Sequence, residues 1–137
     1  MMNEYERQAK DFLKKTGAKI TISYKDYAPY FEGEKEYRNI YRIRIDRNGK
    51  SWSFNFGDSI ASTNNGDRPT AYDVLACITK YEPLEADVWD FAKEYGYFID
   101  SKEEYKRVSK IFNAEQKEYK NVCRIFGDVL AELQEIQ

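Results

Sequence analysis

Residue types that commonly carry catalysis are scarce in this sequence. It contains no histidine, which excludes catalytic triads and acid–base pairs that use an imidazole. Its two cysteines, Cys77 and Cys123, are too few and too widely spaced for a disulfide framework or a zinc site. Both lie in apolar helical patterns, and we expect them to act as small buried hydrophobic side chains.

Paired carboxylates could support glycosidase-like chemistry without histidine. The candidates are aspartates in predicted loops or at predicted helix starts: Asp58, Asp67, Asp73, Asp87 and Asp90. Carboxylates at such positions commonly cap helices or bind turn amides, and the sequence has no Asp-x-Asp-x-Asp calcium loop. It also lacks the glycine spacing of phosphate- or dinucleotide-binding loops. We therefore expect a protein that is not an enzyme and uses no metal and no cofactor.

A predicted β-hairpin is the clearest local structure. Residues 40–60 read IYRIRIDRNGKSWSFNFGDSI, and Asn48-Gly49 favours a two-residue type I′ turn, which needs positive φ at both positions. Counting outward from this turn predicts apolar cross-strand pairs on one face: Ile45 with Trp52, Ile43 with Phe54, and Tyr41 with Phe56. The opposite face pairs arginine with polar residues: Arg44 with Ser53, and Arg42 with Asn55.

The polar face of the predicted sheet is rich in basic side chains. With the strand that begins near Ala18 included, strand alternation gathers them on one side: Lys19, Lys25, Arg38, Arg42 and Arg44. Charged residues on the solvated face of such a sheet are ordinary. Arginine nevertheless carries much of the energy of protein interfaces, which makes Arg38, Arg42 and Arg44 candidate binding residues. The aromatic residues of the hairpin fall on the other face, which argues against base stacking.

A second candidate is the aromatic segment DYAPYFEGEKE, residues 26–36, which we predict to be a loop because Pro29 and Gly33 interrupt it. Its candidate contact residues are Tyr27, Tyr30 and Phe31, because tyrosine is enriched at protein interfaces. We favour this segment over the strands as the contact site.

The remaining patterns predict helices. Asn3 can cap a helix that runs to about Lys15, and four further helical patterns lie near residues 70–81, 87–96, 101–126 and 129–137. The order predicts one α+β domain over residues 1–137. Its three-stranded antiparallel meander is covered on one face by the N-terminal helix and the C-terminal helices.

The charge distribution is uneven, although the net charge is −2. Residues 1–57 hold 12 Lys and Arg against 8 Asp and Glu, whereas residues 58–137 hold 10 against 16. The charged N-terminus does not resemble a signal peptide, and no apolar stretch is long enough to span a membrane. We expect a soluble intracellular protein.

The second part of the chain resembles a known group of proteins. The segments WSFNFGDSI, PTAYDVLACITKYEP, DFAKEYGYFIDS and EYKNVCRIFGDVLAELQEIQ, in that order, resemble a family of small proteins encoded by phages and prophages of Gram-positive gut bacteria. The likeness covers roughly residues 38–137. The family has no established common activity, but small acidic phage proteins often inhibit host defence, and anti-CRISPR proteins are among them.

We therefore expect a phage-encoded, non-catalytic binding protein that inhibits a host defence or nucleoprotein target, with anti-CRISPR inhibition as one form. The expected partner is a host or phage protein, and a Cas nuclease is one candidate. The alternative is a nucleic-acid-binding accessory protein of phage replication or recombination, which the basic sheet face supports. Both functions would be carried out in the cytoplasm of the bacterial host, and the oligomeric state stays open.

Overall fold

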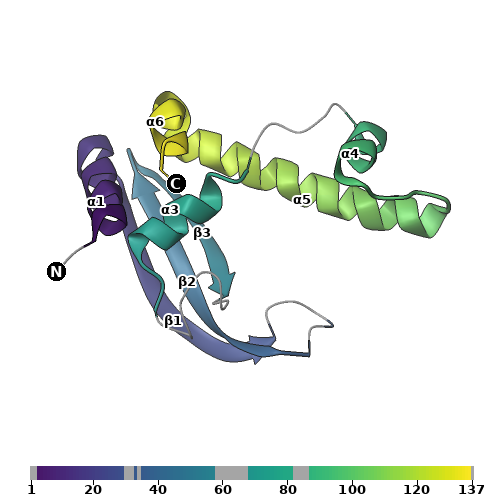
Figure 1. Ribbon diagram of the computed structural model, residues 1–137, viewed down its shortest axis with the longest axis horizontal. Helices are drawn as coiled ribbons and strands as arrows, with labels where there is room; N and C mark the ends of the chain where they lie inside the picture. Colours follow the sequence, from purple (N-terminus) through teal and green to yellow (C-terminus); the bar gives the residue numbers. More distant parts are fainter. Residues whose placement is uncertain (1–2, 30–32, 34, 58–67, 82–86, 137) are drawn as a thin grey trace. The chain divides into compact units, whose positions relative to one another are not determined.

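The computed structural model of this chain describes residues 3–29, 33, 35–57, 68–81 and 87–136. The chain divides into two compact units, which are described separately. The sheet unit comprises Met1–Lys80 and Ile125–Gln137, and the helical unit comprises Tyr81–Arg124. A three-stranded antiparallel sheet with an N-terminal helix and C-terminal helices confirms the predicted α+β class (Figure 1).

Helix α1 (Glu4–Thr16) begins and ends where local sequence signals predict. The Asn3 side chain accepts a hydrogen bond from the Glu6 amide at 2.8 Å, which satisfies one of the unpaired amides of the first turn. Gly17 ends the helix with φ +74°, a left-handed conformation that costs glycine little. Ala9 and Phe12 are buried, which anchors the apolar face of the helix.

The sheet has the strand order β1-β2-β3, with β1 at Lys19–Pro29, β2 at Tyr37–Arg47 and β3 at Lys50–Gly57. Asn48 and Gly49 both have positive φ, 51° and 77°, as a type I′ turn requires. The predicted register of β2 and β3 is confirmed at every pair: Arg47–Lys50, Ile45–Trp52, Arg44–Ser53, Ile43–Phe54, Arg42–Asn55 and Tyr41–Phe56.

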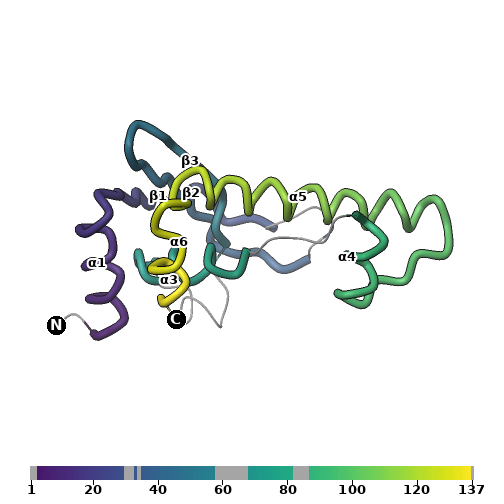
Figure 2. The backbone as a smooth tube through the Cα atoms, turned by 90° about the horizontal axis from the view of Figure 1, so that it is seen from above, coloured from purple at the N-terminus to yellow at the C-terminus, as the bar shows by residue number. Residues whose placement is uncertain are grey.

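The apolar face of the sheet forms the core of the sheet unit. Its buried residues come from β2 and β3: Tyr41, Ile43, Ile45, Trp52 and Phe56. Helices α1, α3 (Ala71–Ile78) and α6 (Leu130–Gln134) lie on one side of the strands (Figure 2). A capping box begins α3: the Thr70 side chain accepts from the Asp73 amide, and the Asp73 side chain accepts from the Thr70 amide.

Strands β1 and β2 are longer than the sequence pattern predicts. Residues 26–29, predicted as loop, continue β1, and the pairing shifts register between Tyr24 and Asp26. This irregularity leaves Lys25 without a cross-strand partner in the β1–β2 register. Strand β3 ends opposite Ile40, so among the described residues the far ends of β1 and β2 pair only with each other. We call this two-stranded extension, residues 25–29 and 37–39, the arm; Figure 1 shows it curving beyond β3.

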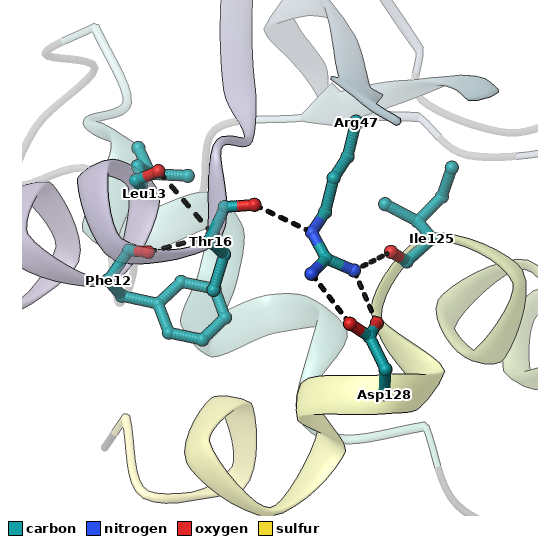
Figure 3. A network of polar contacts seen from close by, with 6 residues as sticks. All are labelled: Phe12, Leu13, Thr16, Arg47, Ile125 and Asp128. Atoms are coloured by element: carbon teal, nitrogen blue, oxygen red, sulfur yellow. Dashed lines mark hydrogen bonds and ion pairs between the residues drawn. The ribbon is translucent and has the colours of Figure 1, made fainter. Parts of the chain in front are cut away.

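Arg47 joins three segments of the sheet unit, and the sequence pattern did not predict this role. It is the last residue of β2 and lies on the apolar face, where its side chain is only 6% exposed. The Arg47 Nε donates to the Thr16 carbonyl at 2.9 Å, and Nη1 donates to the Ile125 carbonyl at 2.9 Å (Figure 3). Its guanidinium also forms a bidentate ion pair with Asp128, in which Nη2 lies 2.8 Å from Oδ2.

This ion pair predicts an acid-dependent loss of stability. Hydrogen bonds from Arg47 lower the pKa of Asp128 from 3.8 to about 2. Because the folded-state pKa is depressed, the stabilisation is present above pH 3.8 and is lost as the pH falls through about 2. In denaturant titrations, the stability difference between wild type and Asp128→Asn should therefore shrink across that window. A difference independent of pH there would contradict the assignment.

The helical unit contains α4 (Val88–Tyr95) and the greater part of α5 (Lys102–Phe126), which lie side by side (Figure 1). Their shared core is Phe91, Ala92, Val108 and Phe112. Trp89 of α4 is not part of this core, because its side chain is 57% exposed. No helix in the part of the chain that the structure describes is long and apolar enough to cross a membrane.

Candidate functional site

The basic sheet face has the exposed arginines that strand alternation predicts. Arg42 and Arg44 are both exposed and point away from the core, since their neighbour Ile43 is fully buried. The Arg42 Nη1 donates to the side-chain carbonyl of Asn55 at 3.2 Å across the strand pair. Arg38 lies near the start of β2, in the arm, where it is opposite Ala28 and half-buried.

An aspartate that sequence reasoning overlooked lies on the same face. Asp46 follows the alternation of Arg42 and Arg44, and its carboxylate accepts from the Arg44 Nε at 3.0 Å. Ser51 also donates to Asp46, at 2.7 Å, and this hydrogen bond is the main reason why the pKa of Asp46 is lowered. The charge of Arg44 is thus partly neutralised within the sheet. The alternation that selected the arginines would also have identified Asp46.

The exposed arginines should contribute little to folding. Replacing both Arg42 and Arg44 by serine should change the free energy of unfolding by less than about 0.5 kcal/mol per site, because exposed ion pairs stabilise weakly. Urea denaturation of the double variant measures this directly. A loss of several times that size would mean that the basic face supports the fold.

A patch of tyrosines continues the apolar face of the sheet onto the arm. Tyr24, Tyr27 and Tyr37 are 54%, 58% and 58% exposed, and we call them the tyrosine patch. The Tyr27 and Tyr37 rings lie 5.5 Å apart, and the Tyr24 ring meets the buried Tyr41 ring edge-on at 5.6 Å. Tyr27 is a predicted site residue, but it lies in a strand rather than in a loop. The predicted contacts Tyr30 and Phe31 lie outside the described residues.

The arm explains why the Tyr27 and Tyr37 rings are exposed. Tyr27 is opposite Asn39, and Tyr37 is opposite Pro29, beyond the point where β3 ends. Strand alternation still directs both rings to the face that is buried farther along the sheet. In the sequence, the signal for the patch was the run of tyrosines near the ends of both strands. The sequence pattern did not show that β1 extends as far as Pro29.

The side chains considered for catalysis do not form a cluster in the described part of the chain. Asp73 forms the α3 capping box with Thr70. The Asp87 side chain accepts from the Asp90 amide at 2.9 Å, and Asp90 itself is exposed in the first turn of α4. Asp58 and Asp67 lie outside the described residues. Cys77 and Cys123 are free and half-buried, and burial raises the pKa of the Cys77 thiol. No group of three or more Cys, Asp or Glu side chains among the described residues could hold a metal ion.

Comparison with known proteins adds no relative. No protein-family model matches the chain, and neither the curated proteins nor the solved structures contain a significant match. The candidate site therefore rests on the geometry of the tyrosine patch and the basic sheet face.

Proposed function

We propose that this chain is a non-catalytic binding protein that recognises another protein through the tyrosine patch. The observation that carries the proposal is that three tyrosines, each more than half exposed, lie on one face of the sheet, two of them on the arm and Tyr24 directly before it. Tyrosine supplies a large, rigid contact area together with a hydroxyl for hydrogen bonding, which is why it is enriched at protein interfaces. Strand pairing holds the backbone of Tyr27 and Tyr37 in an extended conformation, which reduces the entropy that is lost on binding.

A protein partner fits these surfaces better than a nucleic acid. Phosphate recognition depends on available cations, but Arg44 is paired with Asp46, and Arg42 donates to Asn55. The tyrosines lie on the opposite face from these arginines, so the two groups do not form one stacking and phosphate-binding surface.

The partner that we propose is a host defence protein or nucleoprotein, and a Cas nuclease is one candidate. This part of the proposal depends on the resemblance to phage-encoded proteins. It predicts that expression of the chain raises phage plaque counts on a CRISPR-defended bacterial host but not on the matched undefended host. Equal counts on the defended host with and without the protein would remove CRISPR interference as the target.

The contact surface is tested with variants of matched exposure. Tyr27→Ser combined with Tyr37→Ser should abolish capture of the partner found by affinity purification from that host, while the protein stays folded. Tyr5→Ser is the control, because Tyr5 is 54% exposed and its ring also has one aromatic neighbour, Tyr72, at 5.2 Å. Retained capture by the patch variant, or equal loss in the control, would contradict the assignment.

The second candidate function is nucleic-acid binding by the basic sheet face, which the exposure of Arg42 and Arg44 favours. Phosphate contacts would make binding fall steeply with added salt. Gel-shift titrations with single- and double-stranded DNA at about 50 mM salt test this function. A shift that disappears in the Arg42→Ser, Arg44→Ser double variant would favour it over the protein-binding function.

A further inference from the structure

The helical unit carries a pocket separate from the tyrosine patch and the basic sheet face. Its volume is about 650 Å³, within the range of sites that hold small ligands or single side chains of a partner. Trp89 of α4, Tyr105 of α5 and Ile99 of the connection between them supply the apolar lining. The Trp89 and Tyr105 rings lie 5.5 Å apart at an angle of 38°, so together they form an aromatic corner.

Helix geometry explains why this corner is open. Phe91 anchors α4 in the core of the helical unit, and Trp89, two residues earlier, lies roughly 200° away around the helix. Trp89 therefore cannot share that core, and it remains 57% exposed. Tyr105 is 39% exposed at the start of α5, one turn before the buried Val108. Exposed large aromatic side chains that line a concave site commonly mark a binding surface.

The polar lining of the pocket is mainly cationic. Lys102 and Lys106 are one helical turn apart on α5, and the one carboxylate among the described lining residues is that of Asp100. The remaining polar lining residue, Ser101, already accepts a hydrogen bond from the Glu104 amide at 3.1 Å. The two lysines are therefore the groups available to attract an anion.

We propose that this pocket binds a peptide segment in which an apolar side chain lies next to carboxylates. The apolar side chain would fill the corner between Trp89 and Tyr105, and the carboxylates would meet Lys102 and Lys106. A nucleic acid fits less well, because the pocket is a local site of about 650 Å³ with two neighbouring lysines, whereas single strands are bound in cationic grooves that follow the phosphate backbone. The proposal goes beyond the function of the tyrosine patch, because it adds a second site in the other unit.

The test uses the full chain and a fluorescein-labelled peptide, Gly-Ser-Glu-Glu-Leu-Phe-Glu-Glu-Gly-Ser, with fluorescence anisotropy as the readout. Trp89→Ala should weaken binding by about thirtyfold, as expected for an aromatic anchor. Lys102→Glu with Lys106→Glu should weaken it by about tenfold, since two partly exposed ion pairs are lost. The matched control is Lys117→Glu with Lys120→Glu, two exposed lysines on the same helix that do not line the pocket and should leave binding unchanged.

Control peptides and alternative ligands distinguish between the possible occupants of the pocket. Replacing Leu-Phe by Ser-Ser, or the four glutamates by glutamines, should each weaken peptide binding in the wild-type protein. Equal binding by these peptides, or unchanged binding in both pocket variants, would overturn the proposal. Tighter binding of a short oligothymidylate would instead assign a nucleic acid, and self-association that Trp89→Ala abolishes would assign a second copy of the chain. The tyrosine-patch variant should bind the peptide normally, so this proposal can fail independently of the proposed function.

Discussion

Replacement of Arg47 by alanine should lower the free energy of unfolding by about 3 kcal/mol, because a buried, charged hydrogen-bond donor is removed. Its guanidinium binds the carbonyls of Thr16 and Ile125 and the carboxylate of Asp128. Asp128 is 65% exposed and water can solvate it after the change, so the main loss comes from the two carbonyls and from packing. Chemical denaturation of both proteins at neutral pH measures the difference.

Two further substitutions separate charge from geometry at Arg47. Arg47→Lys keeps a positive charge but lacks the planar guanidinium, whose several donors bind three groups at once. We expect it to lose about half of the stabilisation that Arg47 provides relative to alanine. Arg47→Met keeps the packing against Phe126, whose ring centroid is 6.0 Å from the guanidinium carbon, but loses every polar contact. If Arg47→Met is as stable as the wild type, hydrophobic packing rather than the polar network holds these segments, and the role assigned to Arg47 is wrong.

Ile43→Ser should destabilise the protein by about 4 kcal/mol, because it removes a fully buried side chain and places a hydroxyl in the core. Ile43 is 0% exposed and lies in the central strand, paired with Ile22 on one side and Phe54 on the other. The urea concentration at the midpoint of unfolding should fall, while the slope of the free energy of unfolding against urea concentration stays unchanged. This combination identifies a change in stability alone.

The matched substitution at this site is Ile43→Val, which removes one methylene group and should cost about 1 kcal/mol. The serine substitutions at Arg42 and Arg44 provide the second comparison, because they are adjacent in sequence but exposed. An Ile43→Ser variant that is as stable as the Arg42→Ser, Arg44→Ser variant would contradict the burial pattern of the sheet.

Much of the local structure follows from short-range signals in the sequence. The Asn48-Gly49 turn sets the register of β2 and β3, because a two-residue turn leaves one way to count the pairs. Asn3, Gly17 and Thr70 mark helix ends through contacts that span only a few residues. Such contacts depend on neighbours along the chain, so the sequence alone suffices to predict them.

The exposure of individual aromatic residues could not be predicted in this way. Periodicity places Trp89 and Tyr5 on apolar helix faces, but it does not say which part of a face another element covers. Both side chains are more than half exposed. The same reason applies to the tyrosine patch: strand alternation gives the direction of Tyr27 and Tyr37, but their exposure depends on where β3 ends.

The sequence by itself determined the α+β class, the hairpin register and the face on which Arg42 and Arg44 lie, because each depends on local periodicity and turn chemistry. Tertiary structure alone decided the role of Arg47. Its partners Thr16, Ile125 and Asp128 are 31, 78 and 81 positions away, and no local pattern encodes contacts at such separations. Alternation correctly placed Arg47 on the apolar face, but only the packing of α1 and the end of α5 supplies the oxygen atoms that make its burial favourable.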